Sequence, residues 1–434
     1  MANKRLWLKH VFIDRLHGEL TISAEFNKGI NVIYGDNGVG KTTLLHILSN
    51  IANFDFSRFR HISFEEASLT MNDGTTISVV MKKKSEVPTV SINGEELSVS
   101  ESMPEGSEAE RALFHKYFGK RPVYVPAFRN VLQKMDDRQR NPWDTLNVTR
   151  GLLNMGKDIL GDESKQVQAK TEQCRDWFGK FVPIIRYPSV EEAEAELESY
   201  WVRADSAARR EQARIVSEAT NQILADLLGQ TPNELKEIID SLLDDLPETG
   251  IGVGEIREDF AQAIARAGHA NKSKENNPTE MAVLYVSALI EARSSRNSLF
   301  KKIDRFTQSM NRFLGPDRDF VIGGKYSNKP KPKIAFRNSA KRDYYISGLS
   351  SGERQLLTLL FAAWQGPDES KLMLIDEPEI SLHIDWQRRI LEEMHKQSEQ
   401  QIIACTHSPE VAADLDSGYQ VFDRFSFEGR PRTD

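Results

Sequence analysis

The chain is poor in the features that mark secreted, metal-binding and membrane proteins. Its 434 residues include two cysteines, Cys174 and Cys405, too few for a disulfide framework or a metal-binding cysteine cluster. The longest apolar runs, such as 359–364, are too short to span a bilayer, and the N-terminal MANKRLWLKH lacks the apolar stretch of a signal peptide. Internal repeats and low-complexity tracts are not evident. We therefore expect a protein of the reducing cytoplasm that has no membrane partner.

The chain also lacks a strong excess of either charge. Its net charge is −7, with 39% hydrophobic and 28% charged residues, as in ordinary globular proteins. A surface that bound polyanions over its whole extent is therefore excluded, although a local basic patch is not. The length is sufficient for two or three domains with a large core.

The clearest motif is a phosphate-binding loop at 35–42, which reads G-x-x-x-x-G-K-T. It follows a short apolar strand at 30–34 and precedes a helical pattern at 43–48. Glycines let backbone N–H groups close around a phosphate, and the helix N-terminus adds positive partial charge. We expect Lys41 to reach the β- and γ-phosphates and Thr42 to hold Mg²⁺. The expected nucleotide contacts of this loop are Asn37, Gly38, Gly40, Lys41, Thr42 and Thr43.

The rest of the chain alternates between strand and helix patterns. Short strands are expected at 6–13, 20–26 and 62–98, with hairpin turns at Asn72-Asp73-Gly74 and Asn93-Gly94. Helical patterns dominate from about 145 to 312, and strands return near 320 and 333. This order predicts three parts, namely a first lobe at 1–145 that contains the phosphate-binding loop, a helical insertion at 146–312 and a second lobe at 313–434.

Residues 325–342 form the most basic segment of the chain. They contain seven Lys and Arg residues and no acid, with Tyr326 and Phe336 available for stacking on bases. The segment is a candidate for nucleic-acid binding. Two other readings remain open, an exposed basic hairpin and positive charge collected near bound phosphates.

A second group of motifs lies near the C-terminus. Ser350, with Glu353 three residues later, forms a capping box before an apolar helix that runs to Trp364. The buried strand 372–376 then delivers Asp376 and Glu377 at its end. In phosphate-loop NTPases this is where Mg²⁺ and the attacking water are managed.

These carboxylates and a nearby histidine have distinct expected roles. Asp376 is expected to hold the metal, and Glu377 to orient and deprotonate the water. The strand 401–405 ends in Thr406-His407-Ser408, which places His407 within reach of the γ-phosphate. Taken alone, His407 is also compatible with a purely structural role.

Together these motifs resemble the ABC-type ATPase superfamily. The correspondence assigns GDNGVGKT to the Walker A loop, LSSGE to the signature motif, LMLIDE to Walker B, Ser381-Leu382-His383 to the D-loop and His407 to the switch histidine. The resemblance implies an α/β head with an N-terminal antiparallel β-subdomain and a helical insertion. It also implies that Ser350 and Gly352 contact ATP. The position of the Q-loop holds Ala127-Phe128-Arg129 and no evident glutamine, which leaves that motif unassigned.

The spacing of the motifs narrows the resemblance. Lys41 and Ser350 are 309 residues apart, and DEPEISLH is close to the sequence of a compact, helix-inserted group. That group includes the overcoming-lysogenization-defect nucleases and the ATPase subunits of anti-phage systems such as PARIS and Septu. The chain ends 27 residues after His407, so we expect a separately encoded effector, a nuclease, and a phage-derived trigger. Family members sandwich ATP between two chains, which implies a homo-oligomer.

Two other functions are compatible with the same motifs. A DNA-repair or recombination ATPase of the RecF or SMC-like kind would bind DNA directly, through 325–342. A transporter cassette is disfavoured by the 309-residue spacing, because such cassettes separate the two motifs by roughly a third of that distance.

Overall fold

The computed structural model resolves two compact units. The described residues are 6–82, 87–99, 107–119, 122–129, 159–227, 278–322, 334–338, 340, 342–365, 371–413 and 419–422. Unit 1 comprises Met1–Ala195, Phe306–Val321 and Ile334–Asp434, and unit 2 comprises Glu196–Arg305 and Ile322–Lys333. The predicted boundaries of the three parts stay a prediction.

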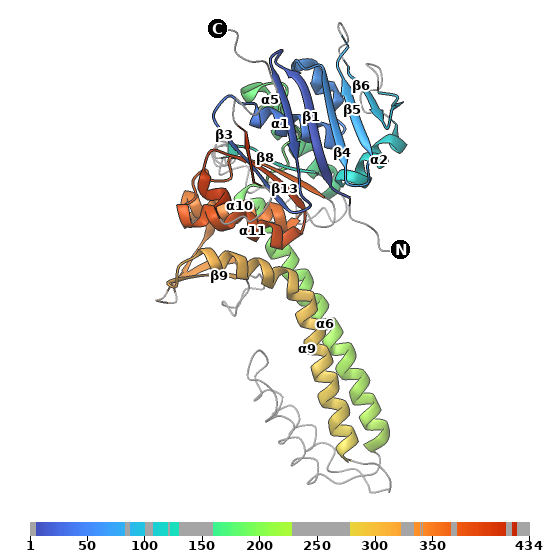
Figure 1. Cartoon of the computed structure of the whole chain (residues 1–434). Coiled ribbons are helices and arrows are strands. Elements are labelled where there is room, and N and C mark those ends of the chain that lie inside the picture. The colour runs from blue at the N-terminus through green and yellow to red at the C-terminus, as the bar shows by residue number, and fades with distance from the viewer. Residues whose placement is uncertain are drawn as a thin grey trace. The chain divides into compact units, whose positions relative to one another are not determined.

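A parallel sheet lies at the centre of unit 1 (Figure 1). Its strand order is β14-β3-β13-β12-β8. The five strands are β14 (Tyr419–Phe422), β3 (Ile30–Gly35), β13 (Gln401–Thr406), β12 (Leu372–Asp376) and β8 (Val123–Val125). Every residue of β12 and β13 is buried, as expected for parallel strands covered on both faces. Because the strands are parallel, their carboxyl ends meet at one edge.

Two helices pack directly on this sheet, and a third packs on one of them. Helix α1 (Lys41–Ala52) packs on β12 and β13, and α11 (Ile384–Ser398) packs on β13 and β3. Helix α10 (Ser351–Gln365) packs on α11. The predicted capping box is confirmed, because the Ser350 hydroxyl accepts from the Glu353 N–H at 3.3 Å and the Glu353 carboxylate accepts from the Ser350 N–H at 2.8 Å.

The second sheet of unit 1 is antiparallel and confirms the predicted N-terminal β-subdomain. Its order is β2-β1-β4-β5-β6-β7. The strands are β1 (Leu8–Leu16), β2 (Leu20–Glu25), β4 (Glu66–Met71), β5 (Thr76–Val80), β6 (Thr89–Ile92) and β7 (Glu95–Glu96). Helix α2 (Glu108–Phe118) follows β7. The turns between β4 and β5 and between β6 and β7 fall at the predicted glycines, Gly74 and Gly94, which both have φ of +88°.

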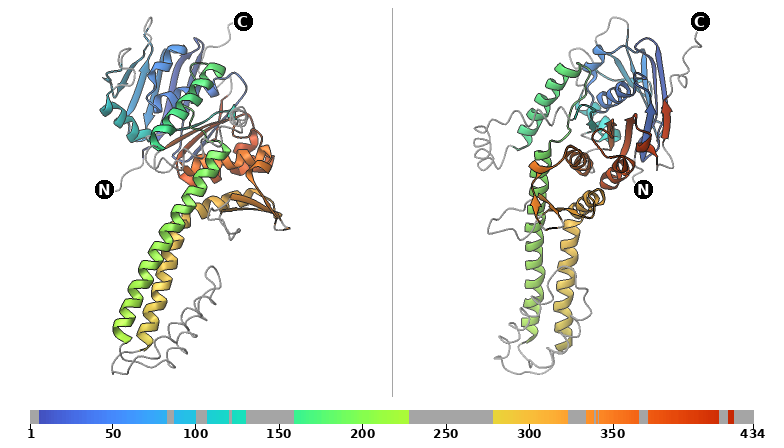
Figure 2. Two further views of the ribbon diagram at one scale, coloured as in Figure 1. Left: turned by 180° about the vertical axis from the view of Figure 1, so that it is seen from behind. Right: turned by 90° about the vertical axis from the view of Figure 1, so that its left-hand side faces the viewer.

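Unit 2 contains two long helical segments. They belong to α6 (Val190–Leu227) and α9 (Pro278–Phe313), which run side by side in opposite directions in both views of Figure 2. Small side chains form the contact: Ala204 and Ala208 pack with Phe300 and Ile303. A second cluster joins Ile215, Ala219, Ala288 and Ala292. The predicted helical insertion is therefore present.

Part of the basic segment 325–342 belongs to a three-stranded sheet with the order β11-β10-β9. Its strands are β9 (Arg318–Ile322), β10 (Ile334–Asn338) and β11 (Asp343–Tyr344). Phe336 is only 2% exposed and packs edge-on against Phe320, with ring centroids 5.1 Å apart. The prediction that Phe336 stacks on bases is therefore wrong, because its ring belongs to the core.

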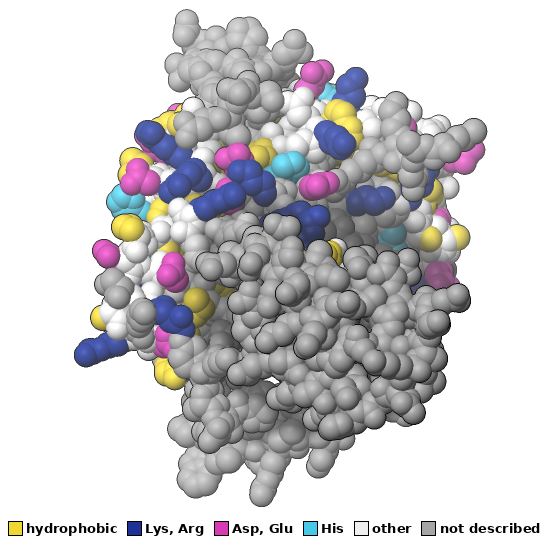
Figure 3. All heavy atoms as spheres, turned by 90° about the horizontal axis from the view of Figure 1, so that it is seen from below, with side chains coloured by type: hydrophobic (Ala, Val, Ile, Leu, Met, Phe, Trp, Pro, Cys, Tyr) yellow, Lys and Arg dark blue, Asp and Glu magenta, His cyan; other side chains and the backbone are white. Residues whose placement is uncertain are grey.

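The basic character of this segment is also reduced by pairing. Arg337 donates to Asp343 at 3.1 Å. Residues 325–333, including Tyr326, lie outside the described residues. On the face shown in Figure 3, the described Lys and Arg side chains stand among Asp and Glu side chains.

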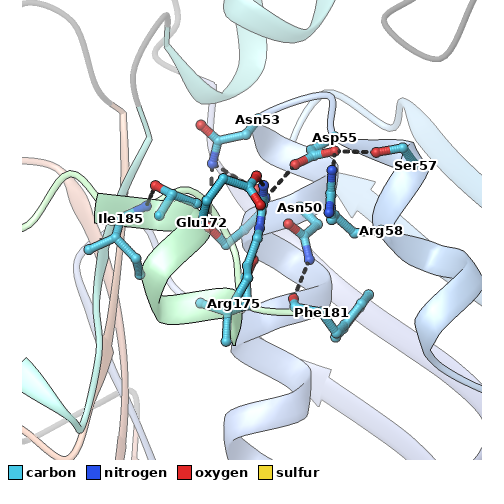
Figure 4. A network of polar contacts seen from close by, with 12 residues as sticks. Asn50, Asn53, Asp55, Ser57, Arg58, Glu172, Arg175, Phe181 and Ile185 are labelled. Atoms are coloured by element: carbon cyan, nitrogen blue, oxygen red, sulfur yellow. Dashed lines mark hydrogen bonds and ion pairs between the residues drawn. The ribbon is translucent and has the colours of Figure 1, made fainter. Parts of the chain in front are cut away.

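A buried polar network holds the C-terminal end of α1 (Figure 4). Arg175, from helix α5 (Ile159–Phe178), donates to Asp55 at 2.8 Å and to the Val182 carbonyl at 2.9 Å. Asn50 donates to the Phe181 carbonyl at 3.0 Å. Since these contacts fix the far end of α1, they also fix the direction in which its first turn points.

Candidate active site

The loop between β3 and α1 has the backbone that close approach to a ligand requires. Gly38 and Gly40 have φ of +82° and +87°, a region that L-residues rarely occupy. A Cβ on Gly40 would also lie 3.3 Å from the Ile22 side chain. Gly40 is the N-cap of α1 and provides no side-chain cap. The first turn of α1, which contains Lys41, Thr42 and Thr43, therefore presents N–H donors suited to an anion.

Lys41 is folded back over this loop. Its Nζ donates to the carbonyl oxygens of Gly35 at 2.6 Å and Asp36 at 2.9 Å, and it lies 3.2 Å from His407 Nε2. Burial lowers the pKa of Lys41, while Glu377 and other anionic neighbours oppose that shift. Carbonyl oxygens are weaker partners for an ammonium than phosphate oxygens. The same ammonium can therefore turn to a phosphate group.

Thr42 and Asp376 form a pair of oxygen ligands at the end of β12. The Thr42 hydroxyl donates to Asp376 Oδ2 at 2.9 Å, whereas Asp376 Oδ1 is buried without a hydrogen-bond partner. Burial raises the pKa of Asp376 to about 6. A buried oxygen that lacks a donor is suited to a hard cation such as Mg²⁺, so these residues fit the predicted metal site. Among the described residues, no group of three or more His, Cys, Asp or Glu could hold a metal alone. Phosphate and water would supply the other ligands.

Glu377 follows β12 directly and has a left-handed backbone, with φ of +50°. Its N–H donates to the Cys405 carbonyl at 2.8 Å, which ties it to β13. Its Oε1 lies 2.9 Å from His407 Nε2. Burial raises the pKa of Glu377 to about 8, with a further contribution from the neighbouring Glu379 carboxylate. Burial and Lys41 lower the pKa of His407.

Glu379 is a half-buried contributor to which the sequence pattern assigned no role. Its Oε1 accepts from the Thr406 hydroxyl at 2.7 Å and from the N–H groups of His407 at 2.9 Å and Ser408 at 3.1 Å. These three bonds fix the peptide that carries His407. The only signal for Glu379 in the sequence is its place as the last acid of D-E-P-E at 376–379. Its distance along the chain from Asp376 does not reveal that its side chain turns toward the end of β13.

The signature residues form a second group. The Ser350 hydroxyl donates to Glu353 at 2.8 Å, and Glu353 also pairs with Arg318. A Cβ on Gly352 would lie 2.9 Å from the Ser381 carbonyl oxygen, so only glycine fits against this turn. These contacts join the signature to the D-loop segment rather than to the phosphate loop. The structure thus gathers Lys41, Thr42, Asp376, Glu377 and His407 at one edge and leaves Ser350 and Gly352 in a separate cluster.

Arg129 is the other residue that the sequence pattern left without a role. It is fully buried and follows β8 by four residues. Burial lowers the pKa of its guanidinium. Its hydrogen bonds reach α10 and the turn that carries Glu377.

The parallel sheet and the phosphate loop define a phosphate-loop NTPase of the α/β class. A family model described as an AAA ATPase domain matches residues 17–412. The chain belongs to this family. The recognition of an ABC-like ATPase and of its fold class from sequence is thereby confirmed.

Two curated relatives match short segments. The Septu protein PtuA of Bacillus thuringiensis is 33% identical over 79 residues, which cover 17% of this chain and 19% of that protein. An uncharacterized ABC transporter ATP-binding protein of Haemophilus influenzae is 37% identical over 87 residues, covering 19% of this chain and 32% of that protein. The chain therefore matches at most 32% of the length of either relative.

Solved structures of SMC heads are also similar. The SMC head domain from Thermotoga maritima is 12% identical, with a TM-score of 0.38 over 96% of this chain and 94% of that chain. The Smc head domain with an extended coiled coil from Pyrococcus furiosus is 13% identical, with a TM-score of 0.39 over 96% and 93%. Within the described residues, no helix has both the length and the apolar character needed to cross a membrane.

Proposed function

We propose that this protein binds ATP with Mg²⁺ between the 36–43 loop and the ends of β12 and β13, and hydrolyses it. The observation that carries the proposal is the convergence of a lysine, a hydroxyl, two carboxylates and a histidine within hydrogen-bond distance at this edge. Lys41 holds the phosphates. Thr42 and Asp376 hold the cation, which neutralises developing charge on the phosphates when it is bound.

Glu377 is the residue that takes a proton from the attacking water. Its carboxylate lies beside His407, and we assign the His407 ring to contact with the terminal phosphate. The raised pKa of Glu377 makes it a stronger base once it is ionised. The bonds from Glu379 to the His407 peptide keep the histidine in this position.

Two copies of the chain complete the site. Ser350 is exposed, and its cluster is separate from the phosphate loop of its own chain. The signature of one copy therefore faces the ATP of the other, as in the ABC-type arrangement. The Glu377→Gln variant should bind ATP without hydrolysing it. Adding ATP to this variant should therefore raise its molecular mass in solution from that of a monomer to that of a dimer or a larger assembly. A mass that stays monomeric under saturating ATP contradicts this step.

The enzymatic test compares two variants. Lys41→Ala should lower phosphate release about 100-fold or more and weaken ATP binding, because it removes the phosphate contact. Glu377→Gln should lower phosphate release to a similar extent and leave ATP binding intact. Lys28→Ala and Glu25→Gln, both exposed, are the matched controls and should behave as wild type. Hydrolysis that survives both site substitutions would show that the site has been assigned wrongly.

We further propose that this ATPase is the cytoplasmic sensor and scaffold subunit of an anti-phage complex, with a separately encoded nuclease as effector. The similarity to the Septu protein PtuA supports this role. Co-expression with an adjacent nuclease gene should yield a complex that protects cells from phage, and Glu377→Gln should abolish the protection. Full protection by this chain alone would contradict the role.

A DNA-binding repair ATPase is the second candidate, and the basic segment 325–342 favours it. It predicts that DNA stimulates ATP hydrolysis and that binding weakens steeply with salt. The burial of Phe336 and the pairing of Arg337 with Asp343 reduce the support for this function. Hydrolysis that is insensitive to DNA would exclude it.

A further inference from the structure

Arg129 is a cation buried among neutral acceptors. Its side chain is fully enclosed, and it makes five hydrogen bonds. NH1 donates to the carbonyls of Pro126 at 3.2 Å and Asp376 at 3.0 Å, and NH2 donates to those of Glu377 at 2.7 Å and Pro378 at 3.2 Å. Nε donates to the Gln355 side chain at 2.9 Å. A guanidinium has five N–H donors in one plane, which matches this set.

Three of these bonds fix the turn that carries Glu377. The carbonyls of Asp376, Glu377 and Pro378 point to the same guanidinium, so the backbone on both sides of Glu377 is tied to one rigid group. This turn includes the left-handed backbone of Glu377, a conformation with a cost for a residue other than glycine. Multiple bonds to one planar group can maintain that conformation.

The fifth bond reaches a different element. Gln355 lies on α10, five residues after Ser350, and is fully buried. Its Oε1 accepts from Arg129 and, at 3.1 Å, from the hydroxyl of Tyr187, which also contacts Thr358 on the same helix. The Glu377 turn and the helix that begins at the signature are therefore joined through one arginine and one glutamine.

We infer that Arg129 is a positioning residue that holds Glu377 in its reactive geometry and makes that geometry depend on the position of α10. The inference rests on the proposed ATP hydrolysis. In that setting, a shift of α10 when the signature meets a partner's nucleotide moves Gln355, and Arg129 transmits the movement to the Glu377 backbone. The catalytic carboxylate is then correctly placed only when α10 is correctly placed.

The test changes Gln355 and leaves the catalytic residues in place. Gln355→Met keeps a similar volume and removes the acceptor for Arg129 Nε, while the carbonyl bonds stay available. We expect kcat for ATP hydrolysis to fall about 10-fold, since small displacements of a catalytic group have effects of this order or larger. The Kd for ATP should change less than about twofold, because the phosphate loop is untouched.

Two further variants separate positioning from a purely structural role. Gln355→Glu keeps an acceptor for Arg129 and should restore kcat to near the wild-type value. Tyr187→Phe is the matched control, because it removes buried hydrogen bonds to α10 without altering the Arg129–Gln355 bond. It should lower thermal stability and leave kcat near wild type. If Gln355→Met does not fold, Arg129→Lys serves instead, since it keeps the cation and loses the fork, and the same fall in kcat with unchanged Kd is expected.

The outcomes are distinct. Two results would overturn the inference. One is an unchanged kcat in Gln355→Met. The other is a fall in kcat across all the variants, Tyr187→Phe included, that is proportional to their fall in melting temperature. A wild-type protein that does not hydrolyse ATP would instead overturn the proposed function on which the inference rests.

Discussion

The two units differ in what they bury. Among the described residues, all buried polar or charged side chains lie in unit 1. This set includes Lys41, Arg129, Asp376 and Glu393. The described core of unit 2 consists of alanines together with larger apolar side chains such as Ile215, Phe300 and Ile303. Its ion pairs, such as those of Arg214 with Glu211 and Glu218, are exposed.

The difference reflects what each unit has to specify. Burying a charge is costly unless each polar atom finds a partner, so it occurs where direction matters more than stability alone. In unit 1, hydrogen bonds orient Asp376, Glu377 and His407 against one edge of the sheet. In unit 2, small side chains let two helices approach, and no directional bond is needed for that packing.

The largest stability effect should come from Glu393 in α11. This buried carboxylate accepts from Ser309 at 2.8 Å, Arg312 at 2.7 Å and Lys396 at 3.1 Å, which joins α11 to the end of α9 within unit 1. Glu393→Ala should lower the free energy of unfolding by about 1–3 kcal/mol, because it takes the acceptor from the buried Ser309 hydroxyl and from two partly exposed cations. Chemical denaturation followed by tryptophan fluorescence measures this. The adjacent Glu392→Ala removes an exposed partner of Lys396 and should have little effect. Equal losses in the two variants would break the distinction between buried and exposed pairs.

A smaller effect should appear in the pH dependence of the melting temperature, measured on nucleotide-free protein in EDTA. The folded-state pKa of Glu377, about 8, lies above the unfolded value of 4.5. The folded state therefore binds the extra proton, and stability from this group is present below about pH 4.5 and is lost as pH rises toward 8. Glu377→Gln cannot ionise, so its melting temperature should exceed that of wild type by about 2–4 °C at pH 8 and by little at pH 5. If the difference in melting temperature between Glu377→Gln and wild type does not grow with pH, the raised pKa of Glu377 is contradicted.

The smallest effect should follow from removing an exposed network in unit 2. Arg214 donates to Glu211 at 2.6 Å and to Glu218 at 2.9 Å on the surface of α6. Solvent screens such pairs and their side chains lose entropy on pairing. Arg214→Ala should therefore leave the melting temperature unchanged within error. A clear loss would indicate that the surface of α6 contributes to stability as strongly as the buried networks of unit 1.

The sequence predicted the parts of the site that local patterns determine. The phosphate loop, the capping box at Ser350 and the buried strand before Asp376 each depend on residues close together in the chain. Glu379 and Arg129 were not assigned because their partners are distant. Glu379 binds the N–H groups of His407 and Ser408, directly after β13, and Arg129 binds residues more than 200 positions away. Phe336 was misread because an aromatic residue in a basic segment has the same local pattern whether its ring faces solvent or core. The assignment of the site residues and the domain boundaries remains a prediction.

The order of the central sheet has a consequence for synthesis. Strand β3 lies between β13 and β14, so Ile30 lies beside Ile402, and both neighbours of β3 in the sheet come late in the chain. At roughly 5–20 residues per second, a ribosome needs about 20–70 s between making the two strands. During that time the edge of β3 is unpaired and the chain is exposed to aggregation. Yield in cells should therefore depend on chaperones that hold the nascent N-terminal half, even though every residue of β12 and β13 is buried in the finished sheet.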